Sequence, residues 1–301
     1  MKRLFNFNLP PLLSVGPAAL FLTVFFIAPF AIIAVYSLME SDPFGGVRRA
    51  FSADAYIQFL FTRDWDGNLQ FDLSYLNIFW RSFALAAGAT VLCLAAAFPA
   101  AYYIATQPRR RRGLLLLLIT VPFWANLLVR TYCWVLILRD SGLVNGWLIA
   151  FDLISTPLPL MYTDGAILVG LTYTYLPFMA LPIYASLEKT DWRLIEASRD
   201  LYAGHRQTLA RVVFPLARPG VIAGCIMVFI PSLGAFIAPS LLGGGRNLMI
   251  GSLIQLQFSS SRNWPFGAAS ALILLAFVLL LLYLWRRRSG RSGRDDGESI
   301  W

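Results

Sequence analysis

Charged residues are scarce in this chain of 301 residues. Asp, Glu, Lys and Arg make up 14% of it, whereas a soluble domain carries about a quarter. Hydrophobic residues make up 58%, and the mean hydropathy is +0.64. This composition excludes a water-soluble fold, because so little polar surface cannot cover an apolar chain of this length.

The residues of catalytic and metal sites are scarce too. The two lysines, Lys2 and Lys189, do not stand in the Gly-Lys-Ser/Thr ending of a nucleotide-binding loop. The single histidine, His205, has no cysteine or carboxylate at metal-ligand spacing, and no Gly-x-Ser-x-Gly elbow occurs. The cysteines lie inside apolar runs without zinc or disulfide spacing: Cys93, Cys133 and Cys225. We therefore expect no enzyme, no metal site and no cofactor bound by this chain.

Six apolar runs are long enough to cross a membrane as helices of about 20 residues. They are 14–38, 82–106, 114–138, 165–187, 219–242 and 265–285. Backbone groups in lipid must hydrogen-bond within their own segment, so runs of this length must be helices. The runs contain one charged residue, Arg130, and no acid, which disfavours a proton- or sodium-coupled carrier. The sequence predicts an all-α integral membrane protein with six transmembrane helices.

Positive charge is unevenly divided among the loops. With a cytoplasmic N-terminus, 17 of the 25 Lys and Arg residues lie inside and 7 outside, as the positive-inside rule requires. Both termini are therefore expected in the cytoplasm, and the net charge of +9 reflects topology rather than nucleic-acid binding. We expect a cytoplasmic N-terminus over 1–13, a transmembrane domain over 14–285 and a disordered cytoplasmic tail over 286–301. The first run is too long for a signal peptide and is expected to be retained.

The cytoplasmic loop 188–218 has the pattern of two short helices. Thr190 can cap a helix, Asp191 suits its positive first turn, and Gly204 can end it in the left-handed conformation. These signals predict a helix over 191–203. A second amphipathic piece is expected over 205–213, stopping at Pro215.

The predicted helix 191–203 is amphipathic. One face carries Leu194, Ile195, Ser198, Leu201 and Tyr202. The other carries Arg193, Glu196, Arg199 and Asp200. An isolated helix of about a dozen residues is marginal in water, so either the rest of the chain or a partner's groove must hold it. By pattern alone it could also be an ordinary surface helix.

The same loop carries a recognisable motif. It contains the run Glu196-Ala197-Ser198-Arg199-Asp200-Leu201, followed by Val212-Val213-Phe214-Pro215. This resembles the Glu-Ala-Ala-x3-Gly-x9-Ile-x-Leu-Pro motif of the inner-membrane permease subunits of bacterial ABC importers. Glu196, Ala197 and Pro215 match, and Ser198 replaces the second alanine. Tyr202 stands in the place of the motif glycine, so we expect the end of the first helix to move to Gly204.

Further segments are similar to the spermidine/putrescine branch of this family. They are Pro122-Phe123-Trp124-Ala125-Asn126, Leu176-Pro177-Phe178-Met179, Leu242-Gly243-Gly244, Asn247-Leu248-Met249-Ile250-Gly251 and Arg262-Asn263-Trp264-Pro265-Phe266-Gly267-Ala268. The resemblance covers about 30–285. It implies a type I ABC importer permease-like bundle in the bacterial cytoplasmic membrane, with polyamines as the cargo and another small solute as the alternative.

The resemblance also implies partners and a mechanism. The helix at 191–203 would be a coupling helix seated in a separate ATPase subunit, which binds the ATP and magnesium. The ATPase-coupling residues that it implies are Glu196, Ala197, Ser198, Asp200, Leu201, Gly204 and Pro215. The implied partners are an ABC ATPase dimer, a second permease subunit, identical or distinct, and an extracytoplasmic binding protein.

A path for a flexible polycation would offer aromatic faces, amide oxygens and carboxylates. The candidates are Trp124, Asn126, Tyr132, Trp134, Tyr173 and Tyr175, with Glu40 and Asp164 near the outer ends. Trp and Tyr near helix ends more usually belong to the interfacial belt. Arg130 would repel a cation, which indicates either an ion pair with a neighbouring subunit or an anionic cargo.

Two further expectations concern the outer face and the helix bends. The acidic and aromatic outer segment 39–77, with Asp64 and Asp66, is a candidate docking surface for the binding protein. Prolines within the runs invite kinks that would let the bundle change shape, although Pro is also simply common in membrane helices, and at any single position that interpretation is favoured. These prolines are Pro29, Pro99, Pro122, Pro177, Pro182, Pro231 and Pro239. A secondary transporter, a membrane-embedded enzyme and an assembly scaffold remain as alternatives.

Overall fold

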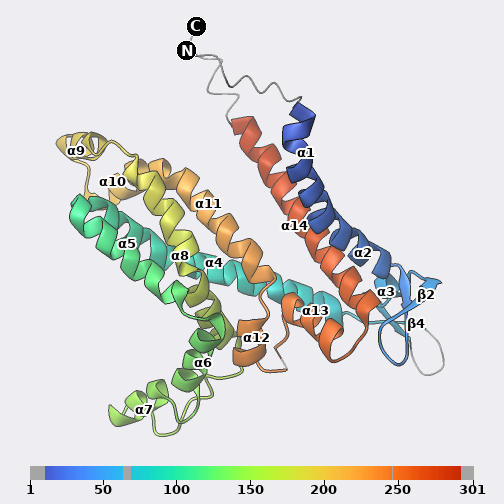
Figure 1. Ribbon diagram of the computed structural model, residues 1–301. Helices are drawn as coiled ribbons and strands as arrows, with labels where there is room; N and C mark the ends of the chain where they lie inside the picture. Colours follow the sequence, from blue (N-terminus) through green and yellow to red (C-terminus); the bar gives the residue numbers. More distant parts are fainter. Residues whose placement is uncertain (1–10, 64–68, 246, 293–301) are drawn as a thin grey trace, which may run out of the picture. The chain divides into compact units, whose positions relative to one another are not determined.

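The computed structural model describes residues 11–63, 69–245 and 247–292 of a mainly helical chain (Figure 1). Five described helices are long and apolar enough to cross a membrane, and a bent pair makes a sixth span. The predicted helical membrane fold is confirmed. The chain divides into two units, residues 1–75 with 254–301 and residues 76–253.

The first unit joins the two ends of the chain. Its helices are α1 (Pro11–Leu22), the π-helical segment η1 (Thr23–Ile27), α2 (Ala28–Tyr36), α3 (Asp54–Ile57) and α14 (Trp264–Ser292). Helix α14 packs beside α2 (Figure 1) and continues past the predicted end of the span at 285. None of the span Ala19–Tyr36 is buried, which suits side chains that face lipid.

The outer part of this unit consists of two short ribbons. Strand β1 (Met39–Ser41) pairs antiparallel with β2 (Val47–Phe51), and β3 (Phe61–Arg63) pairs antiparallel with β4 (Leu69–Phe71). The rings of Phe59, Tyr75 and Phe266 pack together with centroids 4.7–6.3 Å apart. The chain next to the ribbons, at Phe59 and Tyr75, is thus attached to the start of α14 through aromatic packing.

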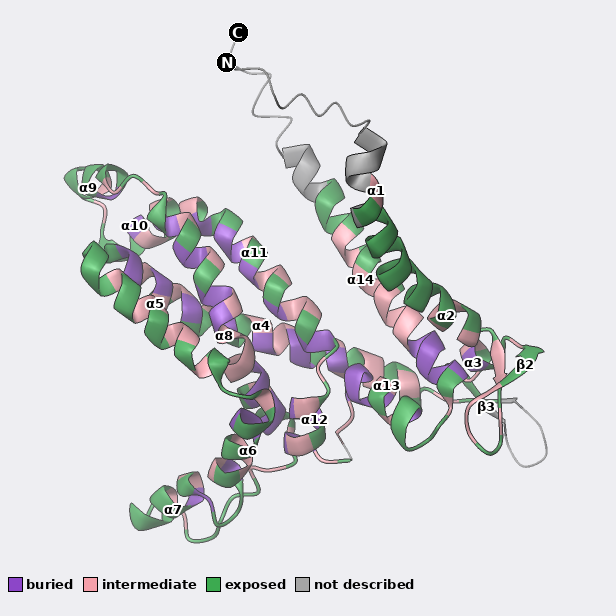
Figure 2. Ribbon diagram, viewed as in Figure 1, coloured by how far each residue is buried: buried purple, intermediate pink, exposed green. Residues whose placement is uncertain are grey.

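The second unit contains the remaining helices. They are α4 (Ser74–Thr106), α5 (Arg109–Trp124), α6 (Leu127–Leu138), α7 (Leu143–Ala150), α8 (Asp164–Glu188), α9 (Arg193–Asp200), α10 (His205–Thr208), η2 (Leu209–Val213), α11 (Phe214–Leu233), α12 (Ile237–Leu242) and the start of α13 (Ile250–Ser259). Figure 2 shows buried residues along α4, α8 and α11.

Small residues let α8 and α11 approach closely. A Cβ atom on Gly220 would lie 2.7 Å from the Ser186 Cβ and would also overlap the Pro182 carbonyl oxygen. A Cβ atom on Gly224 would lie 2.7 Å from the Met179 sulfur. Close backbone approach at small residues is the usual basis of helix pairing in membranes.

The third predicted span is not one straight helix. Helix α5 ends at Trp124, Ala125 and Asn126 have extended backbone with ψ of 147° and 134°, and the chain bends by 89° before α6. The prediction of a continuous helix over 114–138 was therefore wrong. Pro122 lies inside α5, so the break occurs at Ala125 and Asn126 rather than at the proline.

Two prolines are accommodated by wider helical turns. Segment η1 comes just before Pro29, and η2 comes just before Pro215. In η2 the Phe214 N–H bonds to the Leu209 carbonyl five residues back, which makes room for a following residue that has no N–H. The expectation that the second cytoplasmic piece stops at Pro215 was wrong, because helix continues from His205 to Leu233.

Candidate coupling segment and pathway residues

Helix α9 is shorter than the sequence predicts. It covers Arg193–Asp200 instead of 191–203. The Asp191 carboxylate accepts a hydrogen bond from the Arg193 N–H at 3.1 Å, so it satisfies a free amide of the first turn. The Thr190 hydroxyl instead donates to the Ser186 carbonyl at 3.4 Å, at the end of α8. The Asp191 side chain therefore caps the first turn from one residue before Trp192, which holds the N-cap position, and the expected cap at Thr190 was wrong.

The C-terminal end of α9 is closed by Tyr202. This residue has φ +59°, and Gly204 has φ −66° and ψ 159°. The Tyr202 N–H bonds to the Arg199 carbonyl at 2.9 Å, and the Ala203 N–H bonds to the Ser198 carbonyl at 3.1 Å. This is the Schellman pattern with a left-handed residue just past the helix. The helix therefore ends at the position of the motif glycine, and the expected shift of the break to Gly204 was wrong.

Gly204 has another role in the segment. It precedes α10, its carbonyl accepts from the Thr208 N–H at 3.0 Å, and its N–H donates to the Gln207 side chain at 3.2 Å. Pro215 lies in the first turn of α11, where a missing N–H is tolerated after the π turn. These two predicted residues therefore set the start of α10 and the entry into α11.

Three contacts attach α9 to the rest of its unit. The Ile195 side chain is buried and belongs to the apolar core formed by α4, α8 and α11. The Ser198 hydroxyl lies 3.0 Å from the Thr208 hydroxyl, which links α9 to α10. The ring of Trp192 packs against Tyr102 on α4 with centroids 6.3 Å apart. The chain itself thus holds this short helix in place.

The outward surface of α9 mixes charge with apolar groups. Glu196, Ala197 and Asp200 are exposed. So are Leu194, Leu201 and Tyr202, at 49%, 83% and 97%. The predicted apolar face is therefore divided, since its buried part is Ile195 with half-buried Ser198, while the other members face outward. Of the coupling residues predicted from the motif, Glu196, Ala197, Asp200 and Leu201 lie on this surface, whereas Ser198 is half-buried, Gly204 precedes α10 and Pro215 lies in α11.

The base of the segment is connected to α5. The Tyr184 hydroxyl donates to the Glu188 carboxylate at 2.9 Å, and Arg112 lies 4.0 Å from the same carboxylate. Glu188 is the last residue of α8, so these contacts join the ends of α5 and α8 where the coupling segment starts.

The predicted pathway residues fall into separate groups. The ring of Trp134 packs edge-on to Tyr173 with centroids 5.6 Å apart, and the Tyr175 hydroxyl donates to the Pro231 carbonyl at 3.2 Å. Trp124 and Tyr132 are exposed. The Asn126 side chain accepts from the Leu128 N–H at 2.8 Å and caps α6, a structural role that the sequence interpretation did not foresee.

A cavity of about 150 Å³ lies where two spans are interrupted. It is lined by Leu127 at the start of α6, by Leu171, Thr174 and Tyr175 of α8, and by Pro231 and Gly234–Ala238 around the break between α11 and α12. The expected fifth span, 219–242, is therefore broken after Leu233. Non-helical backbone at membrane depth is tolerated where it lines a cavity. Sequence reasoning missed this site, for which Pro231 followed by Gly234 was the available signal.

Arg130 lies beside this region and is buried. Its guanidinium carbon is 5.4 Å from the centre of the Phe123 ring, a cation–π contact across the α5–α6 break. Its Nε has no hydrogen-bond partner among the described residues.

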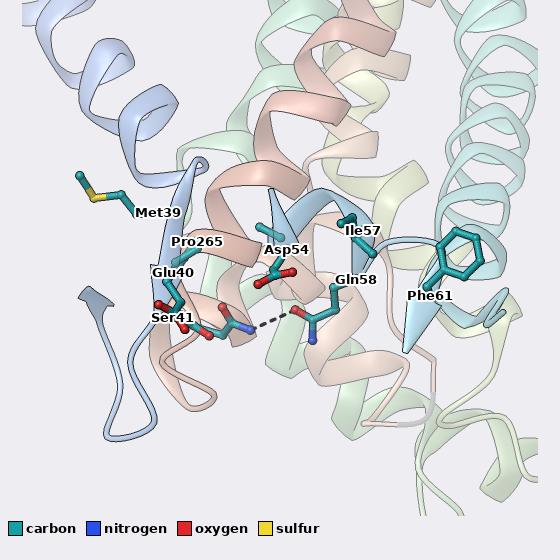
Figure 3. Close-up of a pocket in the computed structure, with 10 residues that line it drawn as sticks. Met39, Glu40, Ser41, Asp54, Ile57, Gln58, Phe61 and Pro265 are labelled. Atoms are coloured by element: carbon teal, nitrogen blue, oxygen red, sulfur yellow. Dashed lines mark hydrogen bonds between the residues drawn. The ribbon is translucent and has the colours of Figure 1, made fainter. Parts of the chain in front are cut away.

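The two predicted outer acids belong to different units. Asp164, at the start of α8, forms an ion pair with Arg81. Glu40 lines a pocket of about 360 Å³ in the first unit, together with Asp54, Gln58 and Asn263 (Figure 3). In this pocket the Asn263 amide donates to the Gln58 side chain at 3.4 Å. Asp64 and Asp66 lie outside the described residues.

The sequence of this chain matches a known family of transport proteins. Residues 97–292 match the family described as the binding-protein-dependent transport system inner membrane component. The chain belongs to this family. It is therefore a multi-pass permease of the inner membrane and not an enzyme.

Three permeases of known name are similar to this chain in sequence. The chain is 39% identical over 266 residues to the spermidine/putrescine transport system permease protein PotB of Escherichia coli (strain K12), which covers 88% of this chain and 93% of that protein. It is 40% identical over 217 residues to PotB of Haemophilus influenzae, covering 72% and 76%. The sulfate transport system permease protein CysT of Escherichia coli is 30% identical over 190 residues, covering 61% and 65%.

A solved structure has a similar fold. The crystal structure of a bacterial ABC transporter involved in the import of the acidic polysaccharide alginate matches with a TM-score of 0.67 at 14% identity, covering 91% of this chain and 94% of that one. Because the identity is only 14%, the match supports the fold alone.

Proposed function

We propose that this chain is the permease subunit of an ABC importer that moves polyamines across the cytoplasmic membrane, with both termini in the cytoplasm. The cargo is supported by 39% identity over 88% of the chain to a permease named for spermidine and putrescine. The relative named for sulfate is less similar and matches a shorter part of the chain. Related permeases thus serve solutes of opposite charge, so the extent of similarity favours the polyamine.

The proposal assigns the coupling of ATP hydrolysis to α9. A separate ATPase dimer would receive this segment, and a second permease and an external binding protein would complete the importer. The observation that carries the assignment is the arrangement of α9. Buried Ile195 fixes the helix to the membrane helices, while Glu196 and Ala197 point out of the unit. A short helix fixed on one side and free on the other can pass the movement of a partner to the bundle.

The proposed coupling role is tested with Glu196→Arg. The variant should insert and assemble normally, because Glu196 is exposed, yet lose at least about tenfold in ATP-driven uptake, since a charge is reversed at the proposed contact. Uptake of labelled putrescine into vesicles that contain the whole importer measures this, with assembly checked by copurification of the ATPase.

The matched control makes the same charge change elsewhere. Asp140→Arg alters an exposed acid in the loop after α6, on the opposite predicted side of the membrane, and should leave uptake unchanged. Normal uptake and normal ATPase stimulation in Glu196→Arg would overturn the coupling role. Uptake that follows a proton gradient without ATP would overturn the importer itself.

The polyamine path is tested at two aromatic residues. Trp124→Ala and Tyr173→Ala should each reduce the uptake rate of spermidine and putrescine by about 3- to 10-fold, the effect of losing one cation–π contact. Trp147→Ala is the control, because Trp147 is an exposed tryptophan on α7 that belongs to no proposed path. Unchanged rates in both pathway variants would remove the aromatic path from the proposal.

A further inference from the structure

Leu201 and Tyr202 are the most exposed large apolar side chains of the coupling segment, and we call them the tip pair. Their exposed fractions are 83% and 97%, among the highest of the large apolar side chains of the chain. They directly follow the last turn of α9, and two backbone hydrogen bonds of the Schellman pattern fix their position. Two large apolar side chains are therefore held in a defined place with almost no cover from their own chain.

Tyr202 is an unfavourable choice for its backbone conformation. A φ of +59° suits glycine and, less well, asparagine, whereas a bulky residue is strained there. Among the described residues, the Tyr202 ring has no ring contact and no side-chain hydrogen bond with its own chain. The folded permease alone thus gains nothing from the ring, and strain of this kind typically marks a functional position.

The surroundings of the tip pair favour a protein over lipid as its cover. Helix α9 has four charged residues among eight: Arg193, Glu196, Arg199 and Asp200. Charges of both signs beside an exposed aromatic ring are typical of the rim and centre of a protein interface, and Tyr is among the residues that contribute most to binding there. The tip pair is also continuous with exposed Glu196 and Ala197, the surface proposed to meet the ATPase.

We propose that Tyr202, with Leu201, is the apolar anchor that seats the coupling segment in the ATPase subunit. The inference rests on the proposed function and adds a residue that departs from the family motif. The partner should present an apolar socket for the tyrosine ring, with acidic and basic residues at its edge. The Tyr202 side chain is 97% exposed, which leaves its ring available to the partner.

Three substitutions separate the ring from the backbone conformation. Tyr202→Gly and Tyr202→Asn relieve the strain and remove the ring, whereas Tyr202→Phe keeps both. Measurements are the thermal unfolding midpoint of the purified permease in detergent, the affinity for the purified ATPase subunit, and ATP-driven uptake by the reconstituted importer. Self-association of the permease without ATPase is measured in parallel.

The anchor predicts opposite effects on stability and binding. The Tyr202→Gly and Tyr202→Asn variants should unfold at the same temperature as the wild type or a higher one. Both should bind the ATPase at least about tenfold more weakly and transport more slowly. The Tyr202→Phe variant should have an ATPase affinity and an uptake rate within about twofold of the wild-type values, because the ring remains. Leu201→Ala should weaken binding less than Tyr202→Gly, because it removes the smaller side chain.

The outcomes distinguish the inference from the function on which it rests. ATPase binding by Tyr202→Gly as tight as that of the wild type would overturn the anchor and leave the coupling role of α9 intact. Loss of permease self-association in Tyr202→Gly, with ATPase binding unchanged, would assign the tip pair to a second copy of the chain and also overturn it. A wild-type chain that neither binds the ATPase nor transports with ATP would overturn the proposed function.

Discussion

The coupling segment 188–218 and the outer segment 39–73 connect membrane helices in very different ways. The coupling segment consists of short helices whose buried residues, such as Ile195, Thr208 and Val213, reach the core of their own unit. The outer segment consists of two-stranded ribbons with exposed rings such as Phe44 and Phe51. The coupling segment is therefore fixed by packing in the core of its unit, whereas the outer segment combines the hydrogen bonds of its ribbons with the packing of Phe59 on Tyr75 and Phe266. We expect changes beneath the coupling segment to cost more.

The largest effect is expected beneath the coupling segment, at Gly220. In Gly220→Val the side chain overlaps the Pro182 carbonyl and Ser186, so α8 and α11 must separate, at a cost of about 3 kcal/mol. Thermal unfolding in detergent and the monodisperse yield measure this. Gly113→Val is the control, since a Cβ on Gly113 meets nothing within 4 Å. Equal stability of the two variants would contradict the close contact of α8 and α11.

The next effect concerns the attachment of α9. Ile195→Ala removes a buried side chain and should destabilise the segment by about 2 kcal/mol, the lower end for such truncations because the site is near the surface. Hydrogen exchange of the α9 amides measures this locally. The neighbouring Leu194→Ala, at a half-exposed position, should change exchange much less. The reverse order would mean that α9 turns its other face to the core.

A smaller effect is expected at Asn263, which lies just before α14 and contacts the outer segment through Gln58. Its side chain accepts a hydrogen bond from the Phe266 N–H at 3.2 Å, which caps α14, and donates to Gln58. Asn263→Ala should cost about 1 kcal/mol for the lost cap. Gln58→Ala loses only the long 3.4 Å bond and should cost less in thermal unfolding. A larger loss in Gln58→Ala would show that the pocket, rather than the cap, stabilises this segment.

The smallest effect is expected at Asp72, before α4. The Ser74 hydroxyl and N–H donate to its carboxylate at 2.6 and 2.8 Å, and these bonds lower the pKa of Asp72 below its ordinary value of 3.8. Because the pKa of Asp72 is lower in the folded state than in the unfolded state, the ionised carboxylate stabilises the folded protein above pH 3.8. This stabilisation is lost as the pH falls through the folded-state pKa.

The Asp72 prediction is measured as a difference between two proteins. Asp72→Asn should unfold at a slightly lower temperature than the wild type at about pH 6, and the difference should shrink as the pH falls below 3.8 and through the lowered pKa of the folded state. A difference that grows toward low pH would contradict the direction of the pKa shift.

The apolar runs predicted the membrane helices because burial in lipid leaves the backbone few alternatives. The breaks could not be predicted in the same way. Pro99 and Pro182 lie inside continuous helices, while the 89° bend between α5 and α6 falls at Ala125 and Asn126, neither of which is a proline. Whether a proline interrupts a helix depends on neighbouring turns, such as η2 before Pro215, and these are set by tertiary contacts.

In the coupling segment, too, the sequence predicted the presence of a helix better than its exact ends. The motif located it, and the cap and end of α9 were expected within two or three residues of where they lie. The end was misplaced because residue preference favours Gly204 over Tyr202 for a left-handed backbone. The chain instead keeps the geometry of the motif and accepts a strained tyrosine. The conformational preference of single residues thus gave the wrong helix end at Tyr202, the residue for which we infer a function.

The helix from His205 to Leu233 runs without interruption through the π turn, and its 29 residues make a rod about 43 Å long. One end touches α9 through Thr208, and the other stops beside Gly234 at the rim of the cavity. Tilting such a rod by about 10° around its midpoint displaces each end by about 4 Å in opposite directions. Under the proposed coupling role, a displacement of the α9 end of this helix would therefore move its cavity end in the opposite direction, without a relay of intermediate side chains.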